Sequence, residues 1–187
     1  MHQLANFIKS KVAIEETDLQ IILSKFKEQT LKKGKFVLKK GQVANQYFFI
    51  ISGGFRFSYG EFDIRDTSWI VFQDQFFTEI SSLILQKPTR FDIEAIEDTV
   101  LQYISRTDME LLYRQFPIWQ EFGRKVLESL AIQMIGQIVS FQVLTAEERY
   151  LEYMKSPEVM QKVPIKNLAS LLGITPNALS RIRKNIR

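Results

Sequence analysis

The chain has 187 residues, of which 45% are hydrophobic and 25% are charged, and its formal net charge is +4. It has no cysteine, and its one histidine is His2, at the N-terminus. These counts exclude cysteine nucleophiles, disulfides, thiolate zinc sites, iron–sulfur clusters and histidine-based triads. No apolar run approaches the roughly 20 residues that span a bilayer, and no signal-peptide pattern opens the chain. We therefore expect a cytoplasmic protein with no membrane partner.

The first half of the chain changes from a helical to a strand-like pattern. Between Gln3 and Phe26, apolar residues recur at spacings of three and four, which predicts helices. From about Glu28 to Ser105, short aromatic and β-branched runs alternate with turns, which is typical of an antiparallel β-roll or jelly roll. Gly53-Gly54 lacks the helix and Lys-Ser/Thr of a phosphate loop, so we interpret it as a hairpin turn. The expected strands cover 36–38, 47–51, 55–59, 69–72, 91–96 and 100–104.

The second half is helical. Thr107-Asp108 is placed to cap a short helix, and Pro117 suits the first turn of a long helix that runs to about Leu144. Thr145 and Glu148 stand in capping-box register for a further helix, which ends before Ser156-Pro157. The long helix carries a heptad-like apolar stripe, which predicts a dimerisation helix. Its residues are Leu127, Leu130, Ala131, Met134, Ile138 and Phe141.

The segment 165–187 carries the signals of a helix-turn-helix, in which two short helices cross steeply and need a small residue at the crossing. Ala169 supplies that small residue, and Gly173 supplies the left-handed end of the first helix. Thr175 is placed to cap the second helix, with Pro176 at its first position. A helical hairpin with a solvated basic end is the alternative, but a hairpin needs neither the Ala and Gly pair nor an acid-free face.

The polar residues of this segment are short near the start of the second helix and basic later, and none is acidic. Short polar side chains suit base edges, whereas basic side chains suit phosphates. The candidates for base edges are Thr175, Asn177, Ser180 and Arg181. The candidates for phosphate contacts are Lys166, Arg183, Lys184 and Arg187. The segment therefore predicts a DNA-binding protein.

With these elements in place, the sequence resembles the CRP/FNR family of bacterial transcription regulators over nearly its whole length. Residues 31–53 resemble the opening strands of the family's cyclic-nucleotide-binding domain, and residues 77–98 resemble its phosphate-binding segment. The run from Thr145 to Arg183 is most similar to the branch common in Bacteroidetes. The resemblance implies a homodimer paired along the long helix and an effector pocket in the β-roll.

The effector pocket departs from the nucleotide-binding members of the family. Of their Gly-Glu pair only Glu79 matches, and Thr89 and Arg90 stand where an Arg-Ser pair would hold the phosphate. Arg90 would serve only after a one-residue slip, which points its side chain to the other face of the strand. Met134 and Ile135 replace two hydroxyl residues that contact the base. The candidate pocket residues are Phe77, Thr78, Glu79, Ile80, Thr89, Arg90 and Met134.

Three states of this pocket stay open: it is apolar, it holds another ligand, or its own side chains fill it. Glu79 is either a ligand contact or a structural carboxylate that accepts backbone N–H bonds. We expect no required cofactor, and the sequence argues against binding of a cyclic nucleotide in the usual way. Any other effector is unknown.

The second helix of the helix-turn-helix also departs from the family. Pro176 and Asn177 replace an Arg and a Glu near its start, and Arg181 matches a later arginine. The family's target sequence therefore does not carry over. Because the chain stops at Arg187, we expect no wing after this helix.

Two other classes of function compete with DNA binding. One is a ligand-binding signalling module with vestigial DNA affinity, which would bind a nucleotide or an apolar effector. The other is an enzyme built on the acidic residues Asp92, Glu94, Glu97 and Asp98. The first two alternate along a strand and the last two look like turn residues, so a solvated strand edge explains them and we expect no enzyme and no metal site.

The predicted fold is α+β: a β-roll of cyclic-nucleotide-binding type, a dimerisation helix and an all-α helix-turn-helix domain. We expect the domains to cover 1–116, 117–144 and 145–187. The predicted function is transcriptional regulation by a homodimer on a palindromic double-stranded DNA site, and RNA polymerase is a candidate partner.

Overall fold

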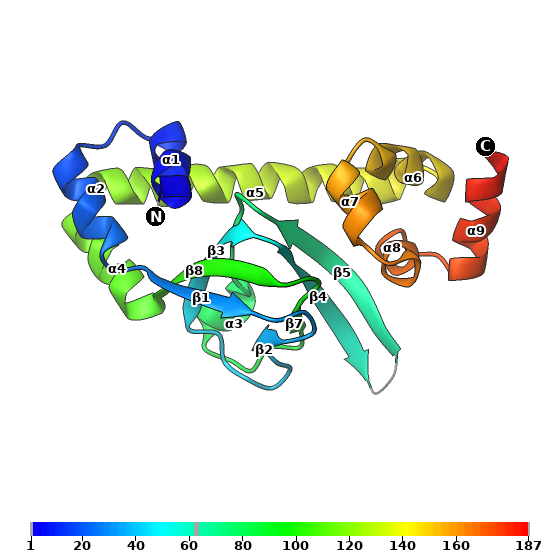
Figure 1. The fold of residues 1–187 in the computed structure, drawn as a ribbon, viewed down its shortest axis with the longest axis horizontal. Helices are drawn as coiled ribbons and strands as arrows, with labels where there is room; N and C mark the ends of the chain where they lie inside the picture. Colours follow the sequence, from blue (N-terminus) through cyan, green and yellow to red (C-terminus); the bar gives the residue numbers. More distant parts are fainter. Residues whose placement is uncertain (1, 62–63, 187) are drawn as a thin grey trace.

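The computed structural model describes residues 2–61 and 64–186. Two helices, α1 (His2–Lys11) and α2 (Glu16–Leu23), precede a β-roll made of two antiparallel four-stranded sheets. A long helix, α5 (Pro117–Val143), runs along one side of the roll and leads to a group of short C-terminal helices at the far end (Figure 1). The predicted α+β architecture is confirmed.

The eight strands in the described part of the chain form two sheets. The strand order in the first sheet is β1 (Lys27–Leu31), β8 (Thr99–Ser105), β3 (Gln46–Ser52) and β6 (Phe76–Phe77). The strand order in the second sheet is β2 (Phe36–Leu38), β7 (Asp92–Ala95), β4 (Gly54–Glu61) and β5 (Ile64–Phe72).

The turn at Gly53 differs from its prediction as a hairpin. Strand β3 before it pairs with β8 and β6, whereas β4 after it pairs with β5 and β7, so the turn joins the two sheets. Gly53 has φ +93°, and a Cβ there would lie 2.8 Å from Cα of Thr99. Only glycine combines this left-handed conformation with such a close approach. The Gly-Gly signal marked a turn correctly, but it did not say which strands the turn connects.

Aromatic side chains fill the space between the two sheets. Phe77 of β6 stacks on Phe48 of β3 at 5.0 Å between ring centroids, and it also lies 5.2 Å from Phe55 of β4. All three are buried in the same apolar cluster. Burial of rings this large contributes much of the stability of a small sheet pair. The many phenylalanines of this region are therefore core residues.

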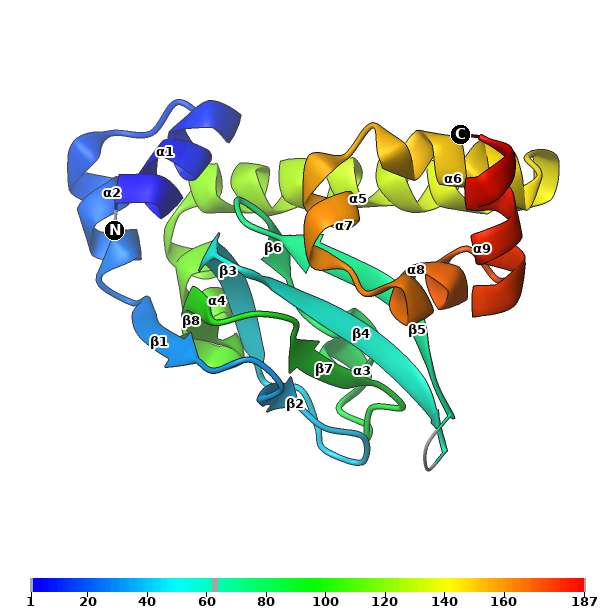
Figure 2. The same cartoon turned by 45° about the vertical axis from the view of Figure 1, so that its right-hand side comes forward.

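A second apolar cluster holds the N-terminal helices, α4 (Arg106–Gln115) and the start of α5 together. Trp119 of α5 lies at its centre, with its ring stacked on Phe122 at 4.4 Å. The N-cap of α4 is Ser105, whose side chain accepts a hydrogen bond from the backbone N–H of Asp108. The cap predicted at Thr107-Asp108 was thus two residues late. Figure 2 shows α1 and α2 packed around the first turns of α5.

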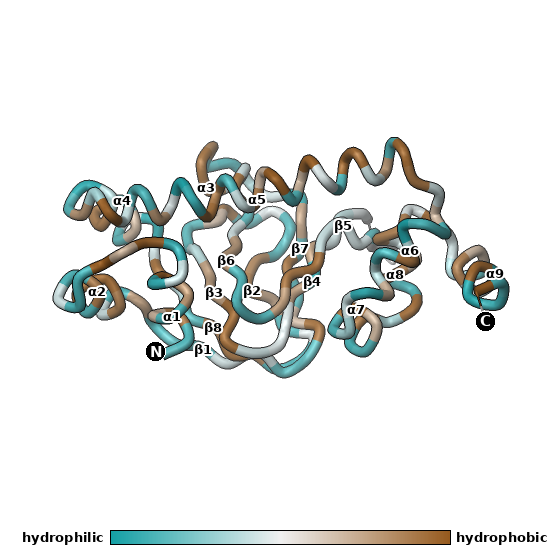
Figure 3. Tube along the Cα trace, turned by 90° about the horizontal axis from the view of Figure 1, so that it is seen from above, coloured by the Kyte–Doolittle hydropathy of each residue, from teal (hydrophilic) through white to brown (hydrophobic). Residues whose placement is uncertain are grey.

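The second half of α5 is exposed on its outer side. Along residues 127–143 no side chain is buried, and hydrophobic residues recur on the free side of the helix (Figure 3). No apolar run of membrane-spanning length was expected, but α5 is long and apolar enough to cross a membrane by length and composition alone, which one core helix of a soluble protein can also satisfy. A soluble monomer rarely leaves such a surface uncovered. The exposed apolar residues are Leu127, Ile132, Met134, Ile135, Ile138, Val139, Phe141 and Val143.

Four short helices complete the chain: α6 (Ala146–Met154), α7 (Pro157–Lys162), α8 (Ile165–Leu171) and α9 (Pro176–Asn185). The capping box predicted at the start of α6 is present, since the side chains of Thr145 and Glu148 each bond the other residue's backbone N–H. Helix α7 was not predicted, although Pro157 occupies a first-turn position in it. The six-residue helix α3 (Ile80–Leu85) was also missed.

Candidate functional site

Helices α8 and α9 form a helix-turn-helix whose turn has the predicted geometry. Gly173 has φ +71°, and Ala169 is fully buried where the helices cross. The side chain of Thr175 accepts a hydrogen bond from the backbone N–H of Ala178 at 3.2 Å, and Pro176 opens α9. Leu179 is fully buried against the first helix's residues in a common cluster. Local sequence signals therefore determine this unit, and tertiary packing agrees with them.

The polar side chains of α9 and its surroundings form one accessible face. Asn177, Ser180 and Arg181 are exposed, as are Lys166 and Lys184, while Arg183 is half-buried. Thr175 is exposed too, but its oxygen accepts the helix-cap bond, so its hydroxyl keeps the proton and one lone pair for a base. Arg187 lies outside the described residues. The face carries no acidic side chain, so its potential is positive.

The helix-turn-helix is docked on the β-roll through α8, and α9 lies farther out (Figure 2). The backbone N–H of Thr67 on β5 donates to Oγ of Ser170 at 2.7 Å. Arg56 of β4 donates from Nη1 to Oδ1 of Asn167 at 3.2 Å and from Nη2 to Oε2 of Glu94 at 2.7 Å. Phe72, at the end of β5, is buried in the apolar core of the C-terminal helices. Neither helix periodicity nor motif spacing pointed to this contact.

Replacing Arg56 with methionine is expected to lower the stability of the docked C-terminal helices by about 1–3 kcal/mol. The Arg56 side chain is 13% exposed and its ion-pair partner 24% exposed, so removing the guanidinium leaves a poorly solvated carboxylate. Urea unfolding, followed with limited proteolysis of α6–α9, measures the change. Arg106→Met is the control, because its ion pair with Glu110 is more exposed and lies within one helix. Equal losses in the two variants would contradict the expectation.

Arg149 links the end of α5 to the C-terminal helices. Its guanidinium donates to the carbonyl oxygen of Leu144 at 2.6 Å and to that of Leu172 at 2.9 Å, and it lies 4.5 Å from the ring centroid of Phe141. One side chain thus connects the end of α5, the start of α6 and the turn of the helix-turn-helix. The orientation of α9 relative to α5 therefore depends on a few contacts around this residue.

Three polar residues of the predicted effector pocket, Thr78, Glu79 and Thr89, are engaged with backbone groups. Glu79 caps α3, accepting hydrogen bonds from the backbone N–H groups of Ser81 and Ser82 at 3.1 and 3.0 Å. Thr89 is buried, and its hydroxyl accepts a bond from the N–H of Phe91. Of the other members, Thr78 donates to the carbonyl oxygen of Gln46, Phe77 lies in the sheet core, and Ile80, Arg90 and Met134 are exposed.

The acidic residues weighed as an enzyme site each have a different partner. Glu94 pairs with Arg56, Glu97 with Lys162 on α7 at 2.8 Å, and Asp98 with Lys32 at 2.7 Å. The carboxylate of Asp92 accepts from the backbone N–H of Lys40. Within residues 2–61 and 64–186, no group of three or more acidic or histidine side chains is placed to hold a metal ion.

Comparisons with known proteins agree with this architecture. Residues 28–116 match the family model of the cyclic nucleotide-binding domain. The chain is similar in structure to a mutant of CooA from Carboxydothermus hydrogenoformans, with 23% identity over 88% of this chain and 77% of that one and a TM-score of 0.67. It is also similar to the c-di-GMP responsive global regulator CLP of Xanthomonas campestris, with 17% identity, 92% and 91% coverage and a TM-score of 0.69.

A third similar structure is the Catabolite Activator Protein of Thermus thermophilus, with 20% identity over 93% of this chain and 84% of that one and a TM-score of 0.57. No curated protein sequence matches the chain. The predicted cyclic nucleotide-binding domain is thus confirmed over residues 28–116, and the chain shares the fold of these three proteins. The assignment to the Bacteroidetes branch stays a prediction.

Proposed function

We propose that this chain, which has a cyclic nucleotide-binding domain and the fold of the CRP/FNR regulators, is a DNA-binding transcriptional regulator that acts as a homodimer in the cytoplasm. The observation that carries the proposal is the exposed, acid-free polar face of α9 on a helix-turn-helix with the expected turn. Such a helix enters the major groove with its N-terminal residues against base edges. RNA polymerase is a candidate partner, with no surface assigned to it.

The homodimer is supported by the apolar outer side of α5. Ile138 is 55% exposed and Leu127 57% exposed, and both lie on the predicted stripe. A second copy of α5 packed on this stripe would cover it and would place two copies of α9 about 34 Å apart, one DNA turn, on a palindromic site. Covering the stripe in this way also accounts for the helix's apolar composition without a membrane.

The β-roll is proposed not to bind cyclic AMP in the usual way. The carboxylate of Glu79 is already engaged by two backbone N–H groups, and Thr89 offers no positive charge to a phosphate. An Arg–phosphate pair is among the strongest contacts such a ligand can make, so its loss weakens binding. No cofactor is required for DNA binding in this proposal.

Selection of bound sites from random duplex DNA with the purified chain tests the proposed function. Recovery of an inverted repeat is the expected result. A signalling module with vestigial DNA affinity is the competing class; it predicts no enriched site at any salt concentration while a ligand still stabilises the protein. That second pattern would reject the proposal.

Replacing Arg181 with alanine is expected to weaken binding to the selected site by about 1–3 kcal/mol and to relax the preference at one base pair. Arg181 is exposed on α9 and long enough to reach a guanine edge. Lys184→Ala is the control, because loss of a phosphate contact weakens specific and random DNA alike. Titrations with the selected site and with random DNA give the ratio of the two affinities for each variant. Equal losses for Arg181→Ala would show that this side chain does not read sequence.

A further inference from the structure

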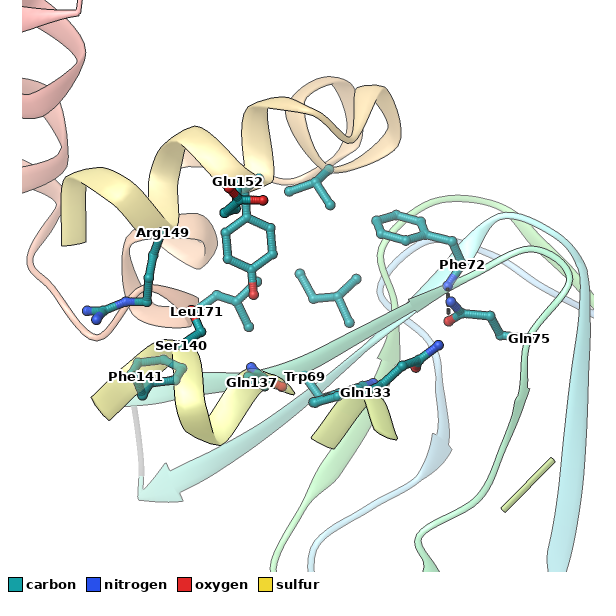
Figure 4. A pocket seen from close by; sticks show the side chains of 13 residues that line it. Trp69, Phe72, Gln75, Gln133, Gln137, Ser140, Phe141, Arg149, Glu152 and Leu171 are labelled. Carbon is teal, nitrogen blue, oxygen red and sulfur yellow. Dashed lines mark hydrogen bonds between the residues drawn. The ribbon is translucent and has the colours of Figure 1, made fainter. Parts of the chain in front are cut away.

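A cavity of about 350 Å³ lies where the β-roll, the dimerisation helix and the C-terminal helices meet. Strand β5 supplies Trp69 and Phe72, and helix α5 supplies Gln133 and Gln137 (Figure 4). Helix α6 closes the third side, with Tyr153 among its lining residues. The volume lies within the range of small-molecule sites. The cavity is separate from the effector pocket predicted in the β-roll, and no residue is common to the two sets.

The side of the cavity formed by α5 carries hydrogen-bonding groups without protein partners. Gln133, Gln137 and Ser140 lie at positions i, i+4 and i+7, which form one stripe along a helix. In the part of the chain that the structure describes, no side-chain hydrogen bond is made by any of the three. Three polar groups in register along α5 are placed to meet hydrogen-bonding groups of a ligand.

Tyr153 faces this stripe from α6. Burial raises the pKa of its hydroxyl above the ordinary value, so the group is protonated at neutral pH and able to donate. No other described residue is hydrogen-bonded to that hydroxyl. The cavity thus has a donor on one side and amides, which both donate and accept, on the other.

The remaining walls favour an uncharged ring. Trp69, Phe72, Val159 and Leu171 supply aromatic and aliphatic surface. Two charged groups line the cavity. Among the described residues Arg149 has no carboxylate partner: its Nη atoms donate to two backbone carbonyls, and its buried Nε has no hydrogen-bond partner. Glu152 pairs with Lys155 at 2.6 Å. A cation would therefore be desolvated here beside an unpaired positive charge, which costs more than the burial of a neutral amide or of a carboxylate that finds partners.

We propose that this cavity is a binding site for a small aromatic molecule that carries an amide or a carboxylate group and no positive charge. The ring packs on Trp69 and Phe72, and the polar group bonds the amides of Gln133 and Gln137.

The site contacts the β-roll, α5 and the C-terminal helices. Gln133, Gln137 and Ser140 each directly precede a residue of the predicted dimer stripe, namely Met134, Ile138 and Phe141. Helix α6 leads directly into the helix-turn-helix. An occupant would fix the angle between α5 and α6 and hence the spacing of the two α9 helices; this consequence, unlike the site itself, rests on the proposed function.

Calorimetric titration of the full chain with three indoles of equal shape tests the site. Indole-3-acetamide is neutral, indole-3-acetate is an anion and tryptamine is a cation. The amide and the anion are expected to bind, and the cation at least about tenfold more weakly. Absence of binding by the amide up to millimolar concentration would overturn the proposal, as would equal affinity for all three.

A variant with Gln133→Ala and Gln137→Ala locates the bound amide. Both side chains are partly or fully exposed and unpartnered, so alanine leaves the fold intact, and about tenfold weaker binding is expected for two lost hydrogen bonds. Gln161→Ala, on the exposed side of α7, is the matched control and should bind normally. Unchanged affinity in the double variant would overturn the site. Because no DNA is present, failure here leaves the DNA-selection experiment untouched.

Discussion

Replacing Ile138 with glutamate is expected to dissociate the homodimer, raising its dissociation constant more than about 100-fold. Ile138 is 55% exposed in the single chain and lies on the apolar stripe of α5. In a paired helix this position would be covered, so two carboxylates would lie near the symmetry axis, desolvated and mutually repelling. Sedimentation velocity over a range of concentrations measures the change.

The control for this change is Ile132→Glu. Ile132 is 71% exposed on the same helix, but it lies six residues away, which is about 120° around the helix axis. It is outside the predicted stripe, so its replacement should leave the dimer intact. Dissociation by both variants would show that the interface is not the predicted stripe, and dissociation by neither would reject pairing along α5.

DNA binding provides a second measurement on the same pair of variants. A single helix-turn-helix makes half of the contacts of a symmetric dimer, so Ile138→Glu should lose most of its affinity for an inverted repeat. Its affinity for random DNA, which depends on phosphate contacts, should fall less. The helix-turn-helix itself is remote from the change, because Ala169 and Leu179 pack within their own cluster.

The helix-turn-helix could be predicted from the sequence because each of its signals is local. Gly173, Thr175 and Pro176 fix the turn and the start of α9 within four residues, and the backbone adopts the conformations that these residue types favour. The capping box at Thr145 and the long helix from Pro117 are local in the same sense. Their side chains act on backbone groups a turn or less away.

The docking of α8 on the β-roll could not be predicted in this way. Arg56 and Asn167 are 111 positions apart, and Thr67 and Ser170 are 103 apart. Nothing in helical or strand periodicity says which distant surfaces meet. The sheet partition was missed for the same reason, since Gly53 announces a turn but not the partners of the strands beside it.

The short helices and the role of Glu79 could not be predicted from the sequence for a different reason. Helix α3 has six residues, too few for a period of 3.6 to be visible. Once α3 forms, its first N–H groups need an acceptor, and Glu79 is adjacent to them. The sequence left the cap and the ligand contact open as roles for Glu79, and in the structure its carboxylate is engaged as the cap.

The cavity beside β5 could not be predicted from the sequence, because each of its residues, taken alone, fits an ordinary structural role. In the sequence, Gln133 and Gln137 fit the solvated side of an amphipathic helix. Trp69 fits a strand residue that faces the core. Only the docking of the C-terminal helices encloses the space between them. A search for amide or hydroxyl groups one turn apart on the side of the dimer helix next to its stripe would have suggested the site.

Replacing Trp119 with alanine is expected to destabilise the protein by about 3–5 kcal/mol. Trp119 is fully buried and stacks on Phe122, its ring lies 6.3 Å from that of Phe26, and its indole N–H contacts Sδ of Met109 at 3.1 Å. Alanine leaves a large cavity between three helices, and the rigid surroundings cannot close it completely. Urea unfolding followed by circular dichroism measures the loss.

The matched control for that change is Trp69→Ala, which removes the same side chain from a half-buried position at the edge of the cavity beside β5. This replacement should lower the free energy of unfolding clearly less, by about 1 kcal/mol, because less apolar surface is returned to water.

Only the first turns of α5 pack in the N-terminal cluster, through Trp119 and Phe122, while its exposed half is left for a second copy. Trp119→Ala should therefore loosen the helix from the β-roll while leaving its dimer stripe unaltered. Equal destabilisation by the two replacements would show that α5 is not anchored at Trp119.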